Sequence, residues 1–415
     1  MAIPQTFVIV GAGLAGAKTA EALRDGGFDG RIVLFGDEAE RPYVRPPLSK
    51  DYLQGKIEKE KIYVHPESWY AEHNVDLERG TRVTGIDTFT HQVSRDNGEP
   101  IRYDKLVLAT GSSPRLLSVP GGDPHRVFML RQVEDCEQIK ATFKTASRVT
   151  VIGAGWIGLE VAAAARSAGL EVTMLERGEL PLLRVLGREL AEVFAGLHRH
   201  HGVDLRLSVQ VAEIMGGDSR RATSVRLADG KQVDADLIIA GVGAIPNIDL
   251  AERAGVVVDN GVKVDEHLRS SDPDIYAVGD VANAFHPLLG KHIRVEHWAN
   301  ALNQPAVAAK SMRGVDAIYD TLPYFYSDQY ELGMEYSGYV EPNGYDEVVF
   351  RGDRDTLEFI AFWVKDHKVL AGMNDNIWDE TEHIRALIES GEQIDSARLA
   401  DTAVAMADML DAPAV

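Results

Sequence analysis

Two stretches of the sequence carry the same arrangement of glycines and could hold phosphate groups. Residues 7–27 and 149–169 of this 415-residue chain each contain an apolar segment, a Gly-x-Gly-x-x-Gly turn and an alanine-rich helical segment. In such a strand–turn–helix unit, the glycines let a pyrophosphate approach the backbone at the N-terminus of the helix. The repeat therefore predicts two dinucleotide sites, formed by Gly11, Gly13 and Gly16 and by Gly153, Gly155 and Gly158.

An acidic residue follows each glycine motif at the distance expected for a ribose-binding carboxylate. Asp37 lies 21 residues after Gly16, and Glu176 lies 18 residues after Gly158. Either motif alone could be a glycine-rich turn that binds nothing, but the strand, the helix and the acid together favour a site. A carboxylate at the second site would bond ribose hydroxyls and repel a 2′-phosphate, which favours NADH over NADPH. Arg177 weakens this preference, because a guanidinium can accommodate a 2′-phosphate.

The elements that must position these residues follow an α/β pattern. Short apolar segments alternate with helical stretches, which is typical of a parallel sheet with helices on its faces. The clearest predicted strands are Phe7–Val10, Ile32–Phe35, Leu106–Ala109, Val149–Ile152, Val172–Leu175, Leu237–Ala240 and Ile275–Val278. We therefore predict two Rossmann-like dinucleotide-binding domains, with ligands collecting at the carboxyl ends of the strands.

The pattern changes from about Asp320 onward and predicts a further α+β domain. Aromatic-rich alternating segments at 324–330, 347–350, 357–364 and 368–372 indicate antiparallel strands. Beyond Thr381, apolar residues at helical spacing predict a helix that packs on this sheet through Ile384, Leu387 and Ile388.

Composition excludes several classes of protein. With 43 Lys and Arg against 64 Asp and Glu, the net charge of −21 disfavours binding to nucleic acid. The only cysteine, Cys136, cannot form a redox-active pair, a Cys-rich zinc site or a protein-ligated iron–sulfur cluster. The 13 histidines show no metal-ligand spacing, so we predict no metal site, and we expect His198, His200 and His201 to form a solvated helix end.

No targeting or membrane signal is apparent in the sequence. The apolar start lacks a basic region and contains three glycines between Phe7 and Ala17, which argues against a signal peptide. No run of eighteen uncharged apolar residues exists, so no membrane span is expected. A cytoplasmic location is the resulting expectation.

Several separated motifs give the chain a resemblance to a known family. They are GAGLAG, RPYVRPPLSK (41–50), LATGSSPR (108–115), GAGWIGLE (153–160), GVGAIPN (241–247), DIYAVGDVAN (274–283), VEHWANA (295–301) and SDQYELG (327–333). With them the chain resembles the NADH-dependent ferredoxin reductases of oxygenase systems, which are flavoproteins of glutathione-reductase-like fold. The resemblance implies an FAD-binding domain over 1–112 and 243–319, an NADH-binding domain over 113–242 and a C-terminal domain over 320–415.

The resemblance also implies roles at the first site. The first glycine motif would bind FAD, with Ala15 on the pyrophosphate, Val83 near the adenine, Arg131 on the nucleotide and Asp280 on the ribityl hydroxyls. Asp280 could otherwise be a helix N-cap. Arg45 and Lys50 lie in a proline-rich loop, where they would face the pyrophosphate and the isoalloxazine. For an arbitrary loop, solvated surface charges would be the simpler interpretation of both.

A second set of residues is expected where NADH meets the flavin. The resemblance places Glu160 near the nicotinamide, so that a Lys50–Glu160 pair forms the catalytic polar centre, and it places Trp298 against the isoalloxazine beside Glu296. Arg184 would cover the NADH nucleotide, and Gly241 and Gly243 would let the backbone approach it. The alternatives are a helix-dipole acid for Glu160 and a core residue for Trp298.

The partner that follows from the resemblance is a two-iron ferredoxin that feeds an oxygenase. NADH gives up a hydride whereas such a ferredoxin accepts one electron at a time, and FAD can join the two processes. Between Ala284 and Val315, four basic residues face only one acidic residue, so this segment is a hypothetical docking patch: Lys291, Arg294, Lys310 and Arg313 against Glu296. Relatives of this family carry tryptophans before SDQYELG, whereas Tyr324 and Tyr326 here are interpreted as packing residues.

Two alternatives to a ferredoxin reductase remain open. One is a different reductase of the same fold, such as a rubredoxin reductase, an NADH oxidase or a disulfide reductase, although the missing cysteine pair argues against the last two. The other is an NADH-responsive flavoprotein that acts as a redox-controlled interaction protein, as a more distant resemblance to apoptosis-inducing factor allows.

Overall fold

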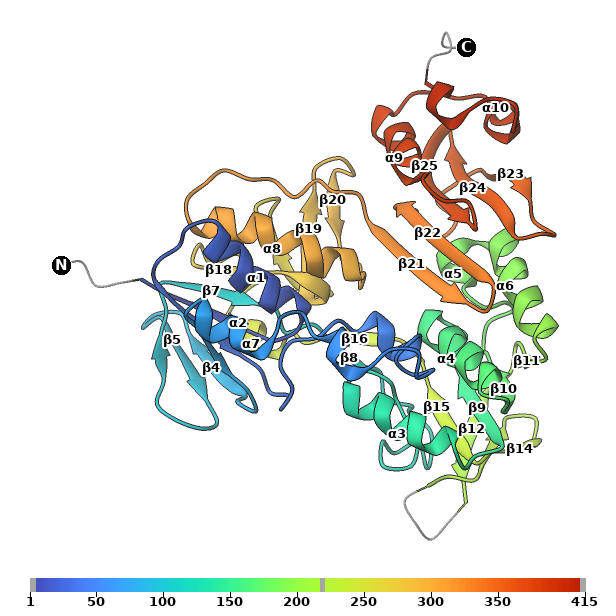
Figure 1. Ribbon diagram of the computed structural model, residues 1–415, viewed down its shortest axis with the longest axis horizontal. Coiled ribbons are helices and arrows are strands. Elements are labelled where there is room, and N and C mark those ends of the chain that lie inside the picture. Colours follow the sequence, from blue (N-terminus) through green and yellow to red (C-terminus); the bar gives the residue numbers. More distant parts are fainter. Residues whose placement is uncertain (1–4, 217–220, 411–415) are drawn as a thin grey trace. The chain divides into compact units, whose positions relative to one another are not determined.

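The computed structural model describes residues 5–216 and 221–410, and its chain divides into two compact units (Figure 1). The first unit contains the described residues up to Val44, Lys59–Ser113 and Ile245–Pro323. The second contains Arg45–Glu58, Pro114–Ala244 and the residues from Tyr324 onward. Each unit is therefore assembled from segments that are far apart in the sequence.

The first unit is centred on a parallel sheet with the strand order β18–β7–β1–β2–β3. The strands are rich in Val, Ile and Leu and almost fully buried, as expected when helices cover a parallel sheet. Helices α1 and α8 pack against each other. The bounds are β1 (Thr6–Val10), β2 (Arg31–Phe35), β3 (Val75–Glu78), β7 (Lys105–Leu108), β18 (Ile275–Ala277), α1 (Leu14–Asp25) and α8 (Trp298–Met312).

Two small sheets and several short helices complete the first unit. One sheet has the order β4–β5–β6 and the other β17–β19–β20. Their bounds are β4 (Val83–Asp87), β5 (Gln92–Arg95), β6 (Ile101–Arg102), β17 (Val262–Val264), β19 (Ala282–His286) and β20 (Lys291–Ile293). The short helices are α2 (Glu67–Glu72), α7 (Asp249–Arg253), η2 (Lys59–Ile62) and η3 (Gly279–Val281).

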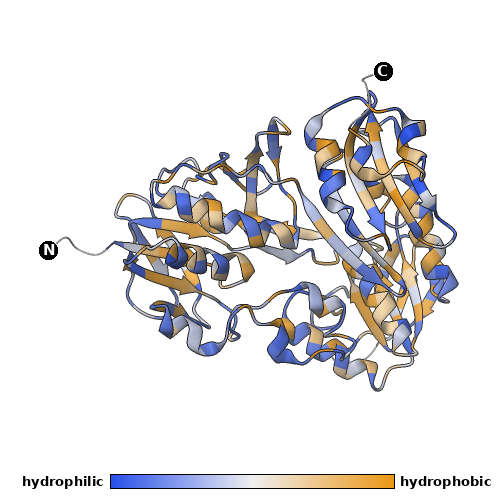
Figure 2. Ribbon diagram, turned by 45° about the horizontal axis from the view of Figure 1, so that its top comes forward, coloured by the Kyte–Doolittle hydropathy of each residue, from blue (hydrophilic) through white to orange (hydrophobic). Residues whose placement is uncertain are grey.

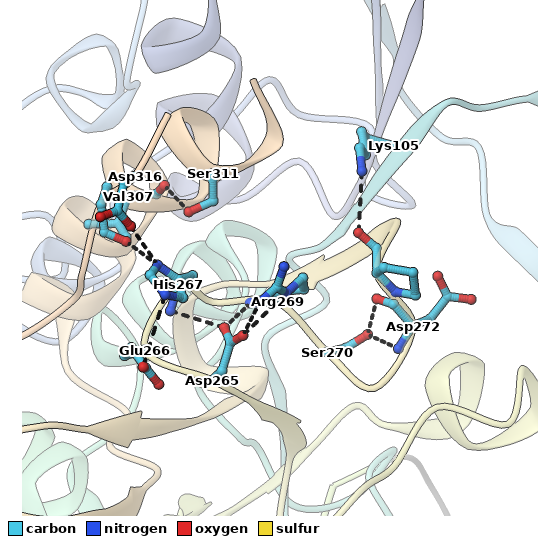
Figure 3. Close-up of polar contacts among 12 residues, drawn as sticks. Lys105, Asp265, Glu266, His267, Arg269, Ser270, Asp272, Val307, Ser311 and Asp316 are labelled. Carbon is cyan, nitrogen blue, oxygen red and sulfur yellow. Dashed lines mark hydrogen bonds and ion pairs between the residues drawn. The ribbon is translucent and has the colours of Figure 1, made fainter. Parts of the chain in front are cut away.

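Polar contacts hold the loop between β17 and β18, as Figure 3 shows. The Asp265 carboxylate accepts the backbone N–H groups of His267 and Arg269 at 3.0 and 2.9 Å, and pairs with the Arg269 guanidinium at 3.0 Å. His267 Nδ1 lies 2.7 Å from the carbonyl oxygen of Ala317, beyond the end of α8. These contacts fix the loop that leads from β17 to β18, and β18 is followed by the turn that carries Asp280.

The second unit contains another parallel sheet, with the order β11–β10–β9–β15, and an antiparallel sheet, β12–β13–β14. The strands are β9 (Arg148–Ile152), β10 (Glu171–Leu175), β11 (Asp204–Arg206), β12 (Val211–Met215), β13 (Ser224–Leu227), β14 (Gln232–Asp234) and β15 (Leu237–Ala240). The helices are η1 (Pro46–Ser49), α3 (Val133–Phe143), α4 (Trp156–Ser167), α5 (Leu183–Leu186) and α6 (Arg188–His200). Two short strands, β8 (Ser112–Pro114) and β16 (Ala244–Pro246), span points at which the chain passes from one unit to the other.

The C-terminal part of the second unit is an antiparallel sheet with the order β21–β22–β25–β24–β23. Its strands are β21 (Tyr324–Gln329), β22 (Leu332–Gly338), β23 (Glu347–Asp353), β24 (Glu358–Lys365) and β25 (Lys368–Asp375), followed by α9 (Thr381–Ser390), α10 (Ser396–Ala400) and η4 (Met406–Asp408). Helix α9 packs on β22 and β25 and buries Ile384, Leu387 and Ile388, as predicted. The hydropathy colours of Figure 2 show hydrophobic residues along the central strands of the sheets.

All seven strands predicted from apolar segments are present, with shifts of one residue at some ends. The segments predicted to be antiparallel form the C-terminal sheet. Within the described residues, the structure has no helix of the length and apolarity that a membrane span requires.

Candidate functional site

The first glycine motif forms a tight turn between β1 and α1. Gly11 has a φ of +113°, and a Cβ added there would lie 2.2 Å from the carbonyl oxygen of Ala109. A Cβ at Gly16 would lie 2.0 Å from the carbonyl oxygen of Gly11, so α1 approaches the turn too closely for any side chain. At Gly13, in contrast, nothing lies within 4 Å of the added Cβ. The backbone at Gly13 is therefore open to a ligand, as a pyrophosphate site requires.

The turn that carries Asp280 lies beside the N-terminus of α1. Gly279 has a φ of +75°, and a Cβ added to it would lie 3.0 Å from the Cβ of Ala15. The side chain of Asp280 accepts a hydrogen bond from Ser112 Oγ at 3.0 Å. Asp280 belongs to a short 3-10 helix, η3, and not to the start of an α-helix. The structure thus brings Ala15 and Asp280 to the same end of the first parallel sheet.

Trp298 is the first residue of α8 and is half-buried, which does not fit the alternative of a core tryptophan. One turn later, Ala301 lies 3.8 Å from the position of a Cβ at Gly279, so α8 begins close to the Asp280 turn. Glu296, which precedes α8, forms an ion pair with Arg294 at 2.6 Å. Trp298 is therefore placed next to the open end of the first motif, whereas the Glu296 carboxylate is held by a neighbouring cation.

Asp37 and Val83 lie together at the edge of the same unit. The Asp37 carboxylate is half-exposed and pairs with the guanidinium of Arg82 at 2.8 Å. The backbone N–H of Thr81 bonds the carbonyl oxygen of Gly36 at 2.9 Å, which fixes the segment leading to Val83 against the end of β2. Val83 itself is buried at the start of β4. The two residues predicted to contact the adenosine part are thus neighbours.

The second glycine motif repeats the geometry of the first. Gly153 has a φ of +99°, and a Cβ there would lie 2.4 Å from the carbonyl oxygen of Gly241. A Cβ at Gly158 would lie 2.2 Å from the carbonyl oxygen of Gly153, while at Gly155 the space is open. The structure therefore places Gly241 against this loop, and Gly243, with a φ of +105°, two residues beyond it.

Glu176 ties this loop to the end of β10. Its carboxylate accepts the backbone N–H of Ala154 at 2.7 Å and that of Gly178 at 2.6 Å. The backbone N–H of Leu182 bonds the Ala154 carbonyl oxygen at 3.2 Å and so brings the start of α5 to the loop. Arg184 on α5 and Arg177 are both exposed. Next to the second glycine motif there is thus one carboxylate fixed by hydrogen bonds, that of Glu176, and two exposed guanidinium groups, those of Arg177 and Arg184.

A buried ion pair joins the proline-rich loop to the helix of the second motif. Lys50 Nζ lies 2.8 Å from Glu160 Oε1, and the two side chains are only 10% and 5% exposed. Helix α4 begins at Trp156, so Glu160 is its fifth residue, later than the predicted first turn. A carboxylate at that distance from the helix end gains little from the helix dipole. The ammonium of Lys50, not the helix end, is therefore the main electrostatic partner of Glu160.

Two serines that the sequence reasoning did not identify complete the surroundings of Glu160. Ser49 Oγ donates to Glu160 Oε2 at 2.5 Å, and Ser327 Oγ donates to Glu160 Oε1 at 2.7 Å. Both serines belong to motifs noted for the resemblance, RPYVRPPLSK and SDQYELG. Their part in the site could not be recognised in the sequence, because β21 reaches α4 only in the folded chain.

Tyr326 and Asp328 also face the ion pair. Lys50 Nζ lies 5.3 Å from the centre of the Tyr326 ring, within range of a cation–π interaction. Burial is the main cause that raises the pKa of Tyr326 to about 12, so the phenol stays neutral. Burial also raises the pKa of Asp328. The nearby Lys50 ammonium lowers this pKa, and the Glu160 carboxylate raises it further. Tyr326 is therefore more than the packing residue that we expected.

Arg45 and Arg131 are neighbours in the same unit as the ion pair. Arg45 Nη1 donates to the carbonyl oxygen of Arg131 at 2.5 Å. The backbone N–H of Arg131 donates to Asp135 at 3.0 Å, just ahead of α3. The structure thus gathers two of the cations predicted for the pyrophosphate and the nucleotide, with Lys50 on the same loop as Arg45.

The expectation of a solvated histidine cluster is wrong for His198. Its side chain is 0% exposed, and its Nε2 lies 2.9 Å from Gln329 Oε1. Burial lowers the pKa of His198 to about 4. His200 is exposed, and the ring of His201 stacks on Tyr330 with 3.7 Å between centroids. Helical spacing alone did not reveal that one face of α6 is covered by β21 and the turn after it. Among the described residues, no group of three or more His, Cys, Asp or Glu is arranged to hold a metal ion.

Comparison with protein families covers most of the chain. Residues 5–305 match the family described as pyridine nucleotide-disulphide oxidoreductase. Residues 324–410 match the family described as reductase C-terminal. The boundary between the two matches coincides with the change from alternating α/β segments to antiparallel strands.

The similarity to several known proteins covers almost the whole sequence. The chain is 39% identical to putidaredoxin reductase of Pseudomonas putida over 98% of its own length and 96% of that protein. It is 38% identical to the ferredoxin–NAD(+) reductase component of the anthranilate 1,2-dioxygenase system of Burkholderia cepacia, over 97% of this chain and 99% of that protein. A solved structure of a covalent complex of putidaredoxin reductase with putidaredoxin matches with a TM-score of 0.94 and 38% identity, covering 98% of both chains.

These similarities confirm the resemblance that the separated motifs indicated, as well as the predicted fold class.

Proposed function

Because the chain belongs to the pyridine nucleotide-disulphide oxidoreductase family and ends in a reductase C-terminal domain, we propose that it is an FAD-dependent NADH:ferredoxin reductase. Its electron acceptor is a two-iron ferredoxin that supplies an oxygenase. The observation that carries this proposal is the combination of two open glycine loops with a buried lysine–glutamate pair and no cysteine pair. Two dinucleotides can be held, and electrons must leave to an external acceptor.

The residues of the first motif fit FAD. The open backbone at Gly13 and Ala15 would receive the pyrophosphate, and Asp280 would bond the ribityl hydroxyls. Asp37 and Val83 would contact the adenosine, with Arg45 and Arg131 near the phosphates. In this proposal the FAD-binding domain comprises residues 1–112 and 243–319, and Arg131 is a further contact from outside these ranges. When bound, FAD accepts a hydride from NADH and releases electrons singly.

The residues of the second motif fit NADH, which would be bound by residues 113–242. Gly153, Gly155 and Gly158 would receive its pyrophosphate, and Gly241 and Gly243 would leave room for the nucleotide beside the backbone. Glu176 would accept hydrogen bonds from the ribose hydroxyls, and Arg184 would cover the phosphate side. The fixed orientation of Glu176 supports NADH over NADPH, since a 2′-phosphate would meet a carboxylate that cannot turn away.

The Lys50–Glu160 pair would form the polar centre at the edge of the flavin. Lys50 Nζ supplies a positive charge. Because the pair is little exposed to water, this charge interacts more strongly with groups close to it than it would at the surface. Glu160 holds the ammonium in one place and presents its carboxylate toward the nicotinamide. Trp298, at the start of α8, would lie against the flavin ring and limit the access of water. Glu296 would contribute only through its pairing with Arg294.

The structure gives no support to thiol chemistry. Cys136 is buried in α3, and burial raises the pKa of its thiol to about 12. A thiolate is therefore not available to act as a nucleophile or to form a sulfenic acid. This argues against the NADH oxidase and disulfide reductase alternatives.

Two measurements test the proposed function. The purified protein should be yellow, with the visible absorption of oxidised flavin, which NADH should bleach. Reduction of cytochrome c by NADH should increase strongly when a two-iron ferredoxin is added. Equal or greater stimulation by rubredoxin would favour a rubredoxin reductase. Slow reduction that ferredoxin does not stimulate, with a persistent flavin–nicotinamide charge-transfer band, would favour a redox-controlled interaction protein.

A basic surface near the end of α8 is proposed as part of the ferredoxin docking site. Of the four basic residues noted in this segment, Arg294 is largely buried and paired with Glu296, whereas Lys310 and Arg313 are exposed. Reversing the charges of Lys310 and Arg313 should raise the KM for ferredoxin and flatten its dependence on salt. Unchanged values for both quantities would rule out this patch.

We also propose that the protein acts in the cytoplasm. NADH is an intracellular reductant, and the single cysteine is what a reducing compartment permits. Fractionation of the native cells would test this location.

A further inference from the structure

A chain of buried hydrogen bonds leads from Glu160 into the C-terminal sheet. Ser327 Oγ on β21 donates to Glu160 Oε1 at 2.7 Å, and Gln329 Nε2 lies 3.1 Å from Ser327 Oγ. The other end of the Gln329 amide, Oε1, lies 2.9 Å from Nε2 of His198 on α6. Ser327 and Gln329 are each 1% exposed, and His198 is 0% exposed. The last residues of β21 thus connect α4 with α6.

The donor and acceptor properties of His198, Gln329 and Ser327 determine the direction of these hydrogen bonds. The pKa of about 4 leaves His198 neutral near neutral pH, with one ring N–H. Because the Gln329 oxygen can only accept, His198 Nε2 carries that hydrogen. The Gln329 amide nitrogen then donates to Ser327 Oγ, and the single hydroxyl hydrogen of Ser327 is directed to Glu160. If the Gln329 amide were turned around, its oxygen would face Ser327 and would need the Ser327 hydroxyl hydrogen. Glu160 would then lose the hydrogen bond from Ser327.

Glu160 therefore has three directional contacts from two segments, the loop that carries Ser49 and Lys50 and the strand β21 that carries Ser327. Lys50 and Ser327 both contact Oε1, at 2.8 and 2.7 Å, and Ser49 contacts Oε2 at 2.5 Å. Lys50 has a long flexible side chain, whereas Ser327 is anchored on a strand and is further fixed by Gln329. Hydrogen bonds to a charged acceptor are the stronger kind. Ser327 is thus a contact that can hold Oε1 more rigidly than Lys50 can, while Ser49 contacts Oε2.

We propose that Ser327 is a positioning residue for the hydride transfer, and that Gln329 and His198 orient its hydroxyl group. Through these hydrogen bonds, the C-terminal domain supports the proposed reductase centre. Ser327 touches neither cofactor in this proposal and acts only through Glu160 and its partner Lys50. The inference rests on the proposed function, because the position of Glu160 affects a rate only if NADH reacts next to it.

The test compares Ser327→Ala with Ser337→Ala in the FAD-loaded protein. Ser337 is a matched control, since it is buried on the adjacent strand β22 and its Oγ has no hydrogen-bond partner among the described residues. Rapid mixing with NADH should show flavin reduction slowed roughly tenfold by Ser327→Ala, the effect of losing one charge-assisted hydrogen bond. The dissociation constant for NADH and the rate of the Ser337→Ala variant should both remain unchanged.

Two further variants distinguish positioning from a general structural effect. In a Glu160→Gln background, Ser327→Ala should slow flavin reduction much less than it does in the native protein, because both changes affect the same contact. The loss in thermal unfolding midpoint caused by Ser327→Ala should likewise be smaller in that background. Gln329→Leu should slow reduction less than Ser327→Ala does, since the Ser327 hydroxyl remains but is no longer oriented.

The failure of this inference differs from the failure of the proposed function. If the native protein binds FAD and reacts with NADH but Ser327→Ala behaves like Ser337→Ala, the positioning role is overturned. Additive effects of Ser327→Ala and Glu160→Gln on the rate would overturn it as well. If the native protein binds no flavin, the proposed function itself is wrong.

Discussion

The ammonium of Lys50 and the carboxylate of Glu160 form a buried ion pair at 2.8 Å that joins a proline-rich loop to helix α4. Neither group is solvated well enough to stand alone, since their side chains are 10% and 5% exposed. An unpaired charge at such a depth is strongly unfavourable. The pair therefore links the stability of this unit to the reactivity that we propose for it.

Removing one member of this pair should cost more stability than removing both. Lys50→Met leaves the Glu160 carboxylate buried without its cation and should lower the free energy of unfolding by about 3–5 kcal/mol. The double variant Lys50→Met/Glu160→Leu should recover most of that loss but should still be reduced slowly by NADH. Denaturant unfolding and rapid-mixing kinetics measure the two effects. Equal destabilisation by the single and the double variant would contradict this account of the pair.

The second and third glycines of the first motif should respond differently to alanine. Gly13→Ala should give a folded protein, because the added Cβ meets nothing within 4 Å, but the protein should retain little FAD. Gly16→Ala should be destabilised, because its Cβ would lie 2.0 Å from the Gly11 carbonyl oxygen. Unfolding midpoints and the ratio of flavin to protein absorbance report these outcomes. Full flavin content in Gly13→Ala would place the pyrophosphate elsewhere.

Glu176 should set the preference for NADH. Glu176→Ala removes a carboxylate that a 2′-phosphate would meet and also releases the N–H groups of Ala154 and Gly178. The KM for NADH should rise roughly tenfold, a typical effect of losing hydrogen bonds to a charged group, while the KM for NADPH should fall. Glu179→Gln is the control, since Glu179 is exposed on the same turn and paired with Arg188. An unaltered ratio of kcat/KM for the two coenzymes would exclude Glu176 as the determinant.

A buried carboxyl group in the C-terminal sheet should make stability depend on pH. Asp375 is 0% exposed, and neither of its oxygens has a hydrogen-bond partner among the described residues. Burial raises its pKa well above the ordinary value, so the folded state binds a proton that the unfolded state releases above about pH 4. Its contribution to stability is therefore fully present below that pH and is lost as the pH rises through the folded pKa.

Asp375→Asn should remove this loss. Denaturant unfolding measured from pH 4.5 to 8 should show a smaller decrease of stability with pH in Asp375→Asn than in the native protein. Asp355→Asn, in the exposed turn between β23 and β24, should keep the native profile. Parallel profiles for the native protein and Asp375→Asn would mean that Asp375 does not retain its proton in the folded state.

Much of the local structure could be predicted from residue types and spacing. The strands β1 and β9 are short apolar segments followed by glycine, and such segments have few other ways to be buried. The close contacts of Gly16 and Gly158 with the preceding turns also follow from the motif, since only glycine permits them. Asp37 and Glu176, the acids that follow the two glycine motifs, were also recognisable, because the lengths of the helix and the strand fix their distance from the glycines.

The surroundings of Glu160 could not be predicted in this way. Ser49, Ser327 and Gln329 lie in segments that meet only when β21 packs against α4 and α6. Single serines, glutamines and histidines carry no periodic signal, and His198 was for this reason wrongly expected at a solvated helix end.

The sequence by itself determined the two dinucleotide loops, the lack of a cysteine pair and the family, because these depend on local backbone constraints and on composition. Only the tertiary structure decided which polar groups surround the Lys50–Glu160 pair. Burial and hydrogen bonding between distant segments are properties of the packed chain, and they assign to common residues such as Ser327 a role that their type alone does not indicate.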